Sequence, residues 1–227
     1  EWLTLVDLDA VGRHARANTE ILRAIIRAVD IPVQVGGGIA RIEHVDWWID
    51  QGADCVVIAS AAVLNPALIH RAAERHPYRV LVGLDVAQGR VMVDGWTRPT
   101  EHAPLDFIAQ FDRLDVAGVI VTDIDYDTAL PDASFALVTD LARHIATPVI
   151  ASGLVKTLDD LSTLHHLENI AGAVVGRALH EGRFTLRAAL TQVLGGDPDA
   201  LWWRRPEPRR PCTLPRQPAS ARGTQSS

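Results

Sequence analysis

Three aspartates each close a short apolar run, and they are the residues of this sequence best suited to acid–base chemistry. Asp7 ends LTLVD, Asp85 ends VLVGLD and Asp123 ends VIVTD. A carboxyl group at the end of a buried strand can give or take a proton during a reaction. Asp9 and Asp125 stand two residues further on, where loops should begin, so we expect them to cap helices or to hydrogen-bond the backbone instead.

Small residues form two matching sets that suit phosphate groups. GGG (36–38) precedes ASAA (59–62), and SG (152–153) precedes GRAL (176–179). A glycine at a strand end lets backbone N–H groups approach an anion, and a following helix adds favourable partial charge. Turn glycines are common, so each set alone is a weak signal. Together they predict a ligand with two phosphates, bound by Gly37, Gly38, Ser60, Ser152, Gly153, Gly176 and Arg177.

An internal repeat with an offset of 116 residues relates the two sets. PVQVGGGIARIEHV (32–45) aligns with PVIASGLVKTLDDL (148–161), Asp7 aligns with Asp123, and Gly37 aligns with Gly153. Each half carries a strand with D-x-D, a helix, a glycine-bearing strand, a helix, and an apolar strand that ends in small residues. The two halves are therefore expected to share one structure.

Seven apolar runs alternate with amphipathic stretches, which predicts βα units around a parallel sheet. The expected strands are 3–9, 32–37, 55–60, 79–86, 118–124, 148–153 and 172–176, and the clearest helices are 18–29, 40–51, 131–145 and 158–167. The repeat implies an eighth strand that would fall before residue 1. The predicted fold class is therefore α/β, a (βα)8 TIM barrel with a half-barrel repeat that lacks its first βα unit. An open doubly wound sheet is the alternative, because it tolerates seven strands.

The active site of such a barrel lies at the carboxyl ends of its strands. All the residues proposed above for acid–base chemistry and phosphate binding fall at these ends. Trp96 lies in the loop GRVMVDGW (89–96) after Asp85, and this loop could close over a ligand. The nine histidines show no spacing that would bind a metal on this fold.

The last part of the chain differs from the rest in composition. Residues 202–227 hold six arginines and one glutamate, a net charge of +5, which leaves −11 for residues 1–201 out of the total of −6. We expect residues 1–196 to form the barrel and the Pro- and Arg-rich residues 197–227 to stay unfolded.

The composition also limits the compartment and the partners. The acidic barrel argues against nucleic acid, and no apolar run is long enough to cross a membrane. The first residues do not resemble a signal peptide, and Cys55 and Cys212 favour a reducing compartment over a disulfide framework. We expect a cytoplasmic monomer whose partner is a small molecule.

Several stretches together resemble the ProFAR isomerase family of histidine biosynthesis, whose substrate is phosphoribosylformimino-5-aminoimidazole carboxamide ribotide. The stretches are LVDLDA (5–10), VQVGGGIAR (33–41), VGLDVAQGRVMVDGW (82–96), VTDI (121–124), VIASGLVKTLDDL (149–161) and AVVGRALHEGRFTL (173–186). The resemblance runs from about Trp2 to Leu190. It is strongest to the actinobacterial branch, whose enzyme also isomerises phosphoribosylanthranilate for tryptophan biosynthesis.

The resemblance implies an aldose–ketose isomerase that uses no metal and no organic cofactor. The family reaction is an Amadori rearrangement of a bisphosphorylated substrate. Asp85 matches the general acid that opens the ribose ring, Asp123 matches a supporting aspartate, and Trp96 matches the tryptophan that covers the substrate. Asp7 lies near the substrate. The general base matches an aspartate 116 residues before Asp85, outside this sequence.

Some residues depart from the family pattern. Thr128, Pro131 and Asp132 replace residues of a glycine-bearing loop near the second phosphate, and Leu154 replaces the second glycine of SGG. Asp94 stands where the bifunctional branch tends to carry arginine, which weakens the tryptophan-pathway activity more than the histidine one. The alternative function is a truncated or degenerate homologue that binds phosphate ligands without catalysis. The related cyclase ranks lower, because the loop before Trp96 looks isomerase-like.

Overall fold

The computed structural model describes residues 2–11, 18–127 and 131–195. Seven parallel strands form its main sheet, in the order β1-β2-β3-β4-β7-β8-β9. They are β1 Leu3–Val6, β2 Val33–Gly36, β3 Cys55–Ile58, β4 Val80–Ala87, β7 Gly118–Asp123, β8 Val149–Ser152 and β9 Ile170–Val174. All seven strands expected from the apolar runs are confirmed, with ends shifted by up to three residues.

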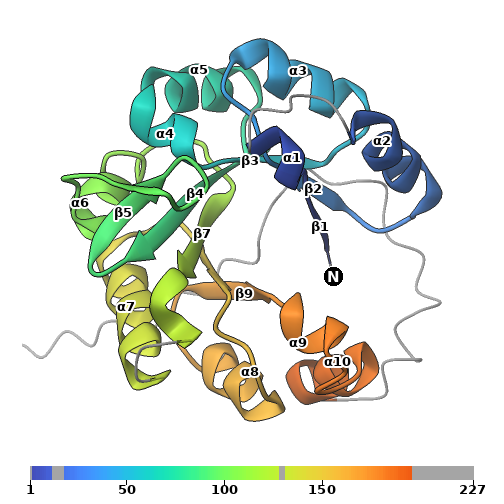
Figure 1. The fold of residues 1–227 in the computed structure, drawn as a ribbon, viewed down its shortest axis with the longest axis vertical. Coiled ribbons are helices and arrows are strands. Elements are labelled where there is room, and N and C mark those ends of the chain that lie inside the picture. The colour runs from blue at the N-terminus through green and yellow to red at the C-terminus, as the bar shows by residue number, and fades with distance from the viewer. Residues whose placement is uncertain (1, 12–17, 128–130, 196–227) are drawn as a thin grey trace, which may run out of the picture.

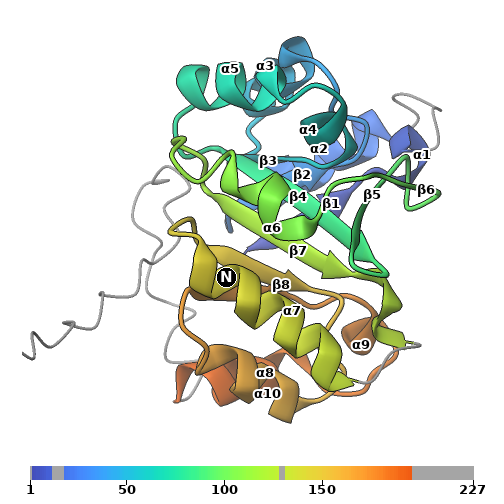
Figure 2. The same ribbon diagram turned by 90° about the vertical axis from the view of Figure 1, so that its left-hand side faces the viewer.

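Helices cover the outer face of this sheet, which curves as part of a barrel (Figure 1). The helices of the described residues are α1 Leu8–Val11, α2 Thr19–Ala28, α3 Ile42–Asp50, α4 Ser60–Leu64, α5 Ala67–Arg75, α6 Pro104–Ala109, α7 Pro131–His144, α8 Leu158–His165, α9 Arg177–His180 and α10 Leu186–Leu194, with a 3-10 turn η1 at Ile124–Asp127. The short α1 and α9 lie beside the strand ends (Figure 2). The α/β barrel class predicted from the repeat is confirmed. No described helix is long and apolar enough to cross a membrane.

The sheet has two ends, β1 and β9, and within the described residues no strand pairing joins them. These end strands are less buried than the strands between them. All four residues of β2 are buried, whereas three residues of β1 are only partly buried and Val6 is 51% exposed. The absence of a first βα unit stays a prediction from the repeat.

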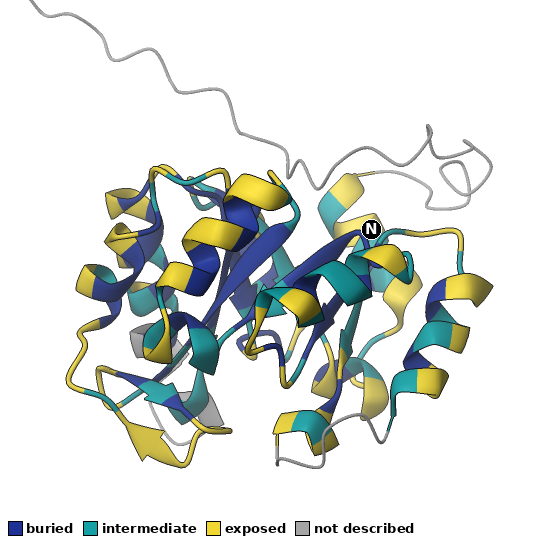
Figure 3. Cartoon of the chain, turned by 90° about the horizontal axis from the view of Figure 1, so that it is seen from above, coloured by how far each residue is buried: buried dark blue, intermediate teal, exposed yellow. Residues whose placement is uncertain are grey.

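The core fills the space between the sheet and the helices, because the parallel strands are apolar on both faces (Figure 3). The longest pairing joins β4 to β7, from Leu81 opposite Gly118 to Val86 opposite Asp123. A second, smaller cluster, which includes Leu81 and Ile150, comes from four neighbouring strands. This packing fixes the strand ends that carry the candidate site.

Strand β4 continues into a hairpin that the sequence did not predict. β5 Arg90–Val93 pairs antiparallel with β4, and β6 Arg98–Pro99 pairs with β5 (Figure 2). Val91 and Val93 are buried, so the hairpin packs firmly against the rest of the chain. The predicted loop before Trp96 (89–96) thus contains a strand, β5, that pairs with β4 and β6.

Two other expectations involve residues that the structure does not describe. Cys55 is buried in β3, and the expectation about the redox state of the two cysteines stays a prediction. The other cysteine, Cys212, lies outside the described residues. The tail predicted at residues 197–227 also lies outside them.

Asp112 fastens the segment that leads into β8. Its Oδ1 accepts hydrogen bonds from the backbone N–H groups of Ala146 at 2.8 Å and Thr147 at 2.7 Å. Burial raises the pKa of Asp112, but these two hydrogen bonds, the Thr147 side chain and the charge of Arg113 together outweigh that effect, so the pKa lies below its ordinary value.

We expect Asp112→Ala to lower the free energy of unfolding by about 2 kcal/mol at pH 7, because two N–H groups lose a charged acceptor. The depressed pKa means that this contribution is present above the ordinary pKa and disappears as the pH falls through the lowered one. Urea unfolding at pH 7 and in acid measures both effects. Glu168→Ala, which removes an exposed carboxylate, is the control. Equal losses for the two variants would contradict the prediction.

Candidate active site

The candidate residues all follow the carboxyl ends of the parallel strands, so they lie along one edge of the barrel. Three strands end next to the aspartates, and the other strands end next to the small residues. The positions are Asp7 after β1, Gly37 and Gly38 after β2, Ser60 after β3, Asp85 within β4, Asp123 at the end of β7, Ser152 and Gly153 at the end of β8, and Gly176 and Arg177 after β9.

Asp85 is the carboxyl group with the environment of a general acid. It lies opposite Thr122 in the pairing of β4 with β7. Burial raises its pKa above the ordinary 3.8, although hydrogen bonds from the side chains of Trp96 and Thr122 act in the opposite direction. Asp85 therefore keeps its proton to a higher pH than an exposed aspartate does, which suits a proton donor.

Trp96 reaches Asp85 from the turn between β5 and β6. Its backbone has a φ of 69°, and the residue is half exposed, with its side chain close enough to Asp85 to lower the pKa of that carboxyl group. Neighbouring contacts hold this turn: Arg98 Nε lies 2.9 Å from Asp94 Oδ2, and the Asp94 N–H donates to Ser60 Oγ at 2.9 Å. The hairpin therefore connects the end of β3 with the proposed acid on β4.

Asp7 is only 3% exposed, and local donors occupy one of its oxygens. Asp7 Oδ1 accepts from the Ala10 N–H at 3.1 Å and from Asn18 Nδ2 at 3.0 Å. Asn18 Nδ2 also donates to Asp9 Oδ2 at 2.7 Å. Asn18 is thus a residue of this site that the sequence did not suggest, since nothing in its spacing links it to either aspartate.

Asp123 and Asp125 form a second local network at the end of β7. The Asp125 N–H donates to Asp123 Oδ1 at 3.0 Å, and the Asp125 carboxylate accepts from the N–H of Gln88. The interpretation of Asp125 as a residue that bonds backbone is confirmed. Asp123 is partly buried.

The glycines of the two sets differ in the space around them. A Cβ on Gly37 would lie 2.3 Å from the carbonyl oxygen of Asp7, and one on Gly38 would lie 2.8 Å from the Ala10 Cβ. A Cβ on Gly153 would lie no closer than 3.6 Å to its neighbours, and one on Gly176 would meet nothing within 4 Å. Close packing against Asp7 and Ala10 explains why glycine is needed at positions 37 and 38. Gly153 and Gly176 instead have open space around them that a ligand could fill.

The departures from the family pattern fall in different environments. Leu154 is fully buried in the core, so it packs inside the barrel wall. Thr128 lies outside the described residues. Among the residues that the structure does describe, no group of three or more His, Cys, Asp or Glu side chains could hold a metal ion.

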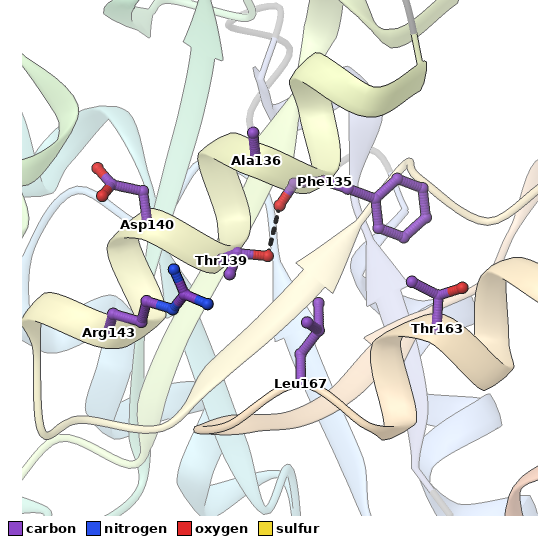
Figure 4. Close-up of a pocket in the computed structure, with 7 residues that line it drawn as sticks. All are labelled: Phe135, Ala136, Thr139, Asp140, Arg143, Thr163 and Leu167. Carbon is purple, nitrogen blue, oxygen red and sulfur yellow. Dashed lines mark hydrogen bonds between the residues drawn. The ribbon is translucent and has the colours of Figure 1, made fainter.

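A groove of about 470 Å³ lies elsewhere, between α7 and α8 on the outside of the barrel (Figure 4). Its lining residues come from the middle and the last turns of these helices and from the segment after α8. In a βα unit the helix runs back towards the start of the next strand, so this groove lies away from the strand ends. It is lined by Phe135, Ala136, Thr139, Asp140, Arg143, Thr163 and Leu167. The groove does not contain the candidate acid–base residues.

The fold and the strand-end carboxyl groups define an α/β-barrel protein with a site suited to acid–base chemistry on a small molecule. A family model described as "Histidine biosynthesis protein" matches residues 1–185 of this chain. The chain belongs to this family.

Three proteins that are similar to this chain carry the enzyme name 1-(5-phosphoribosyl)-5-((5-phosphoribosylamino)methylideneamino) imidazole-4-carboxamide isomerase. The relative numbered 2 from Ruegeria pomeroyi is 44% identical over 191 residues, which are 84% of this chain and 77% of the relative. The relative from Paracoccus denitrificans is 40% identical over 190 residues, 84% of this chain and 80% of the relative. The relative from Moorella thermoacetica is 39% identical over 198 residues, 86% of this chain and 82% of the relative.

Proposed function

We propose that this chain is an isomerase that converts ProFAR to its phosphoribulosyl isomer in histidine biosynthesis. The observation that carries the proposal is Asp85, a buried carboxyl group with a raised pKa at the end of β4 and in contact with Trp96. The enzyme name of the relatives supports the same reaction, because it describes an isomerase of this substrate.

Asp85 would begin the reaction as the general acid. In its protonated form it donates its proton to the ribose ring oxygen as the bond from that oxygen to C1 breaks, which leaves a Schiff base at C1. A base then removes the proton from C2, and the resulting enaminol becomes the aminoketose. The resemblance assigns this base to an aspartate outside the sequence, and we propose that Asp123 supports the site from β7.

The two phosphate groups would bind at the two sets of small residues. Ser60 Oγ accepts a hydrogen bond from the Asp94 N–H, so its own hydroxyl proton stays available for a phosphate oxygen. On the other side, the open space around Gly153 and Gly176 lets an anion approach the backbone. Gly37, Gly38, Ser152 and Arg177 complete the proposed sets, which lie on different strands of the same edge.

ProFAR is the proposed substrate in preference to phosphoribosylanthranilate. Asp94 holds the position where the bifunctional branch tends to carry arginine, and its carboxylate pairs with Arg98. We further propose that the enzyme acts in the cytoplasm, because a substrate with two phosphate groups is retained inside cells. We also propose that it acts as a monomer, and that nucleic acids and membranes are not its partners.

Isomerisation of ProFAR by the purified 227-residue chain tests the proposal. Circular dichroism on the same sample shows whether the chain is folded, and calorimetry with ProFAR measures binding without turnover. We expect turnover with ProFAR and a lower kcat/KM with phosphoribosylanthranilate. A folded chain that binds ProFAR but does not isomerise it would favour the alternative of a homologue without catalysis.

A further inference from the structure

A two-residue turn, Gln88–Gly89, joins β4 to β5 and so begins the hairpin of β5 and β6. Both residues have positive φ angles, 51° and 71°, as the tight turn between β4 and β5 requires. This conformation is easy for Gly89, but it is unfavourable for Gln88, whose side chain carries a Cβ. The turn therefore carries a conformational cost at Gln88, and contacts of this residue with the rest of the chain help to offset it.

Asp125 makes such a contact, although it lies 37 residues away in the sequence. Its carboxylate accepts the hydrogen bond from the N–H of Gln88. A bond to an ionised acceptor is stronger than a neutral one. Asp125 belongs to η1, directly after β7, so this bond joins the loop after β7 to the base of the hairpin on β4.

The far end of the same hairpin touches the proposed acid. The side chain of Trp96 lies close enough to the carboxyl group of Asp85 to lower its pKa against the effect of burial. The backbone of Asp125 in turn donates to Asp123 Oδ1 at 3.0 Å. One chain of contacts thus runs from Asp123 through Asp125 and the hairpin to Trp96 and Asp85.

We infer that Asp125 is a positioning residue, which holds the hairpin so that Trp96 stays against Asp85. This inference rests on the proposed function for its consequence in catalysis, but the contact itself exists without turnover. Through its bond to Gln88, Asp125 also couples the loop after β7 to the site on β4, since a shift of η1 moves the base of the hairpin.

The indole N–H of Trp96 reports the contact directly in the ¹⁵N-labelled full chain. Trp96→Phe identifies its NMR signal among the six tryptophans, and Asp85→Ala shows its position without the carboxyl partner. We expect Asp125→Ala to move the signal towards that position and to speed its exchange with water. Asp125→Asn should keep the native position, because the amide oxygen can still accept from Gln88.

Asp159→Ala is the matched control, since it removes an exposed carboxylate from α8. If Asp125→Ala does not fold, Asp125→Ser provides a milder variant whose side chain is too short to reach Gln88. A Trp96 signal that is native in both position and exchange in a folded Asp125→Ala or Asp125→Ser chain would overturn the inference.

Kinetics separates this inference from the proposed function. In an active chain we expect Asp125→Ala to lower kcat about tenfold with little change in KM, and Asp125→Asn to restore most of the rate. If the unaltered chain does not isomerise ProFAR but Asp125→Ala still moves the Trp96 signal, the positioning role stands and the isomerase proposal fails. If the rate falls equally in the Asn and Ala variants while the signal stays native, the positioning role fails.

Discussion

Asp85→Asn is expected to lower the turnover of ProFAR by about 10²-fold or more, the usual scale for a group that transfers a proton in the transition state. Asparagine keeps the size of the side chain and an oxygen that can accept from Trp96 and Thr122, but it has no acidic proton to give. Steady-state kinetics should therefore show the loss in kcat, with a small change in KM. Asp159→Asn on the outer helix α8 controls for the loss of one negative charge. A variant that retains the full rate would remove Asp85 from the mechanism.

The same substitution should make the protein more stable at neutral pH. Burial raises the pKa of Asp85, so the folded chain binds this proton more tightly than the unfolded chain does. The favourable contribution is complete below the ordinary pKa of 3.8 and is lost as the pH rises through the raised value. At a pH above the raised pKa, the charged carboxylate is thus a cost that asparagine removes.

Thermal unfolding measures this second effect independently of activity. We expect the Tm of Asp85→Asn to exceed that of the unaltered chain by about 2 °C or more at pH 7, and the difference to shrink as the pH approaches 4. A lower Tm at pH 7 would mean that the bonds from Trp96 and Thr122 stabilise the carboxylate more than burial destabilises it.

The strands and their order could be predicted because parallel strands buried on both faces are apolar along their whole length. Runs such as VIVTD and PVIAS have this pattern, and the 116-residue repeat fixed their succession. The ends of the strands then located Asp85, Asp123 and the glycines on one edge. None of these inferences required knowledge of a contact between distant residues.

The hairpin and the side-chain network could not be predicted in the same way. Gln88–Gly89 is a weaker turn signal than Asn–Gly, and β5 is only four residues long, so the sequence pattern of GRVMVDGW predicts a loop. The bonds of Asn18 to Asp7 and of Asp125 to Gln88 join residues 11 and 37 positions apart. Such bonds depend on how the loops fold over the strand ends, which no periodic pattern records.

Gly37→Ala is expected to cause the largest loss of stability among the glycines of the site. At its φ of 100° a side chain is strained, and the new Cβ would lie 2.3 Å from the Asp7 carbonyl oxygen and 2.8 Å from the Asp7 nitrogen. These are backbone atoms in the segment that leaves β1, so they cannot rotate away. The strain and the overlap together should cost about 3 kcal/mol or more, a large part of the stability of an ordinary domain.

Gly153→Ala is the matched control, because the repeat aligns Gly153 with Gly37 and its φ is also positive, at 81°. A Cβ there would make only ordinary contacts, 3.6 Å from Thr122 Cγ2 and 3.8 Å from the Asp123 oxygen, so backbone strain of about 1 kcal/mol is the expected cost. Urea unfolding of both variants measures the difference. Equal costs would show that the loop after β2 can move away from Asp7. A larger cost at Gly37, together with weaker ProFAR binding at Gly153, would separate a glycine required by packing from a glycine required by the ligand.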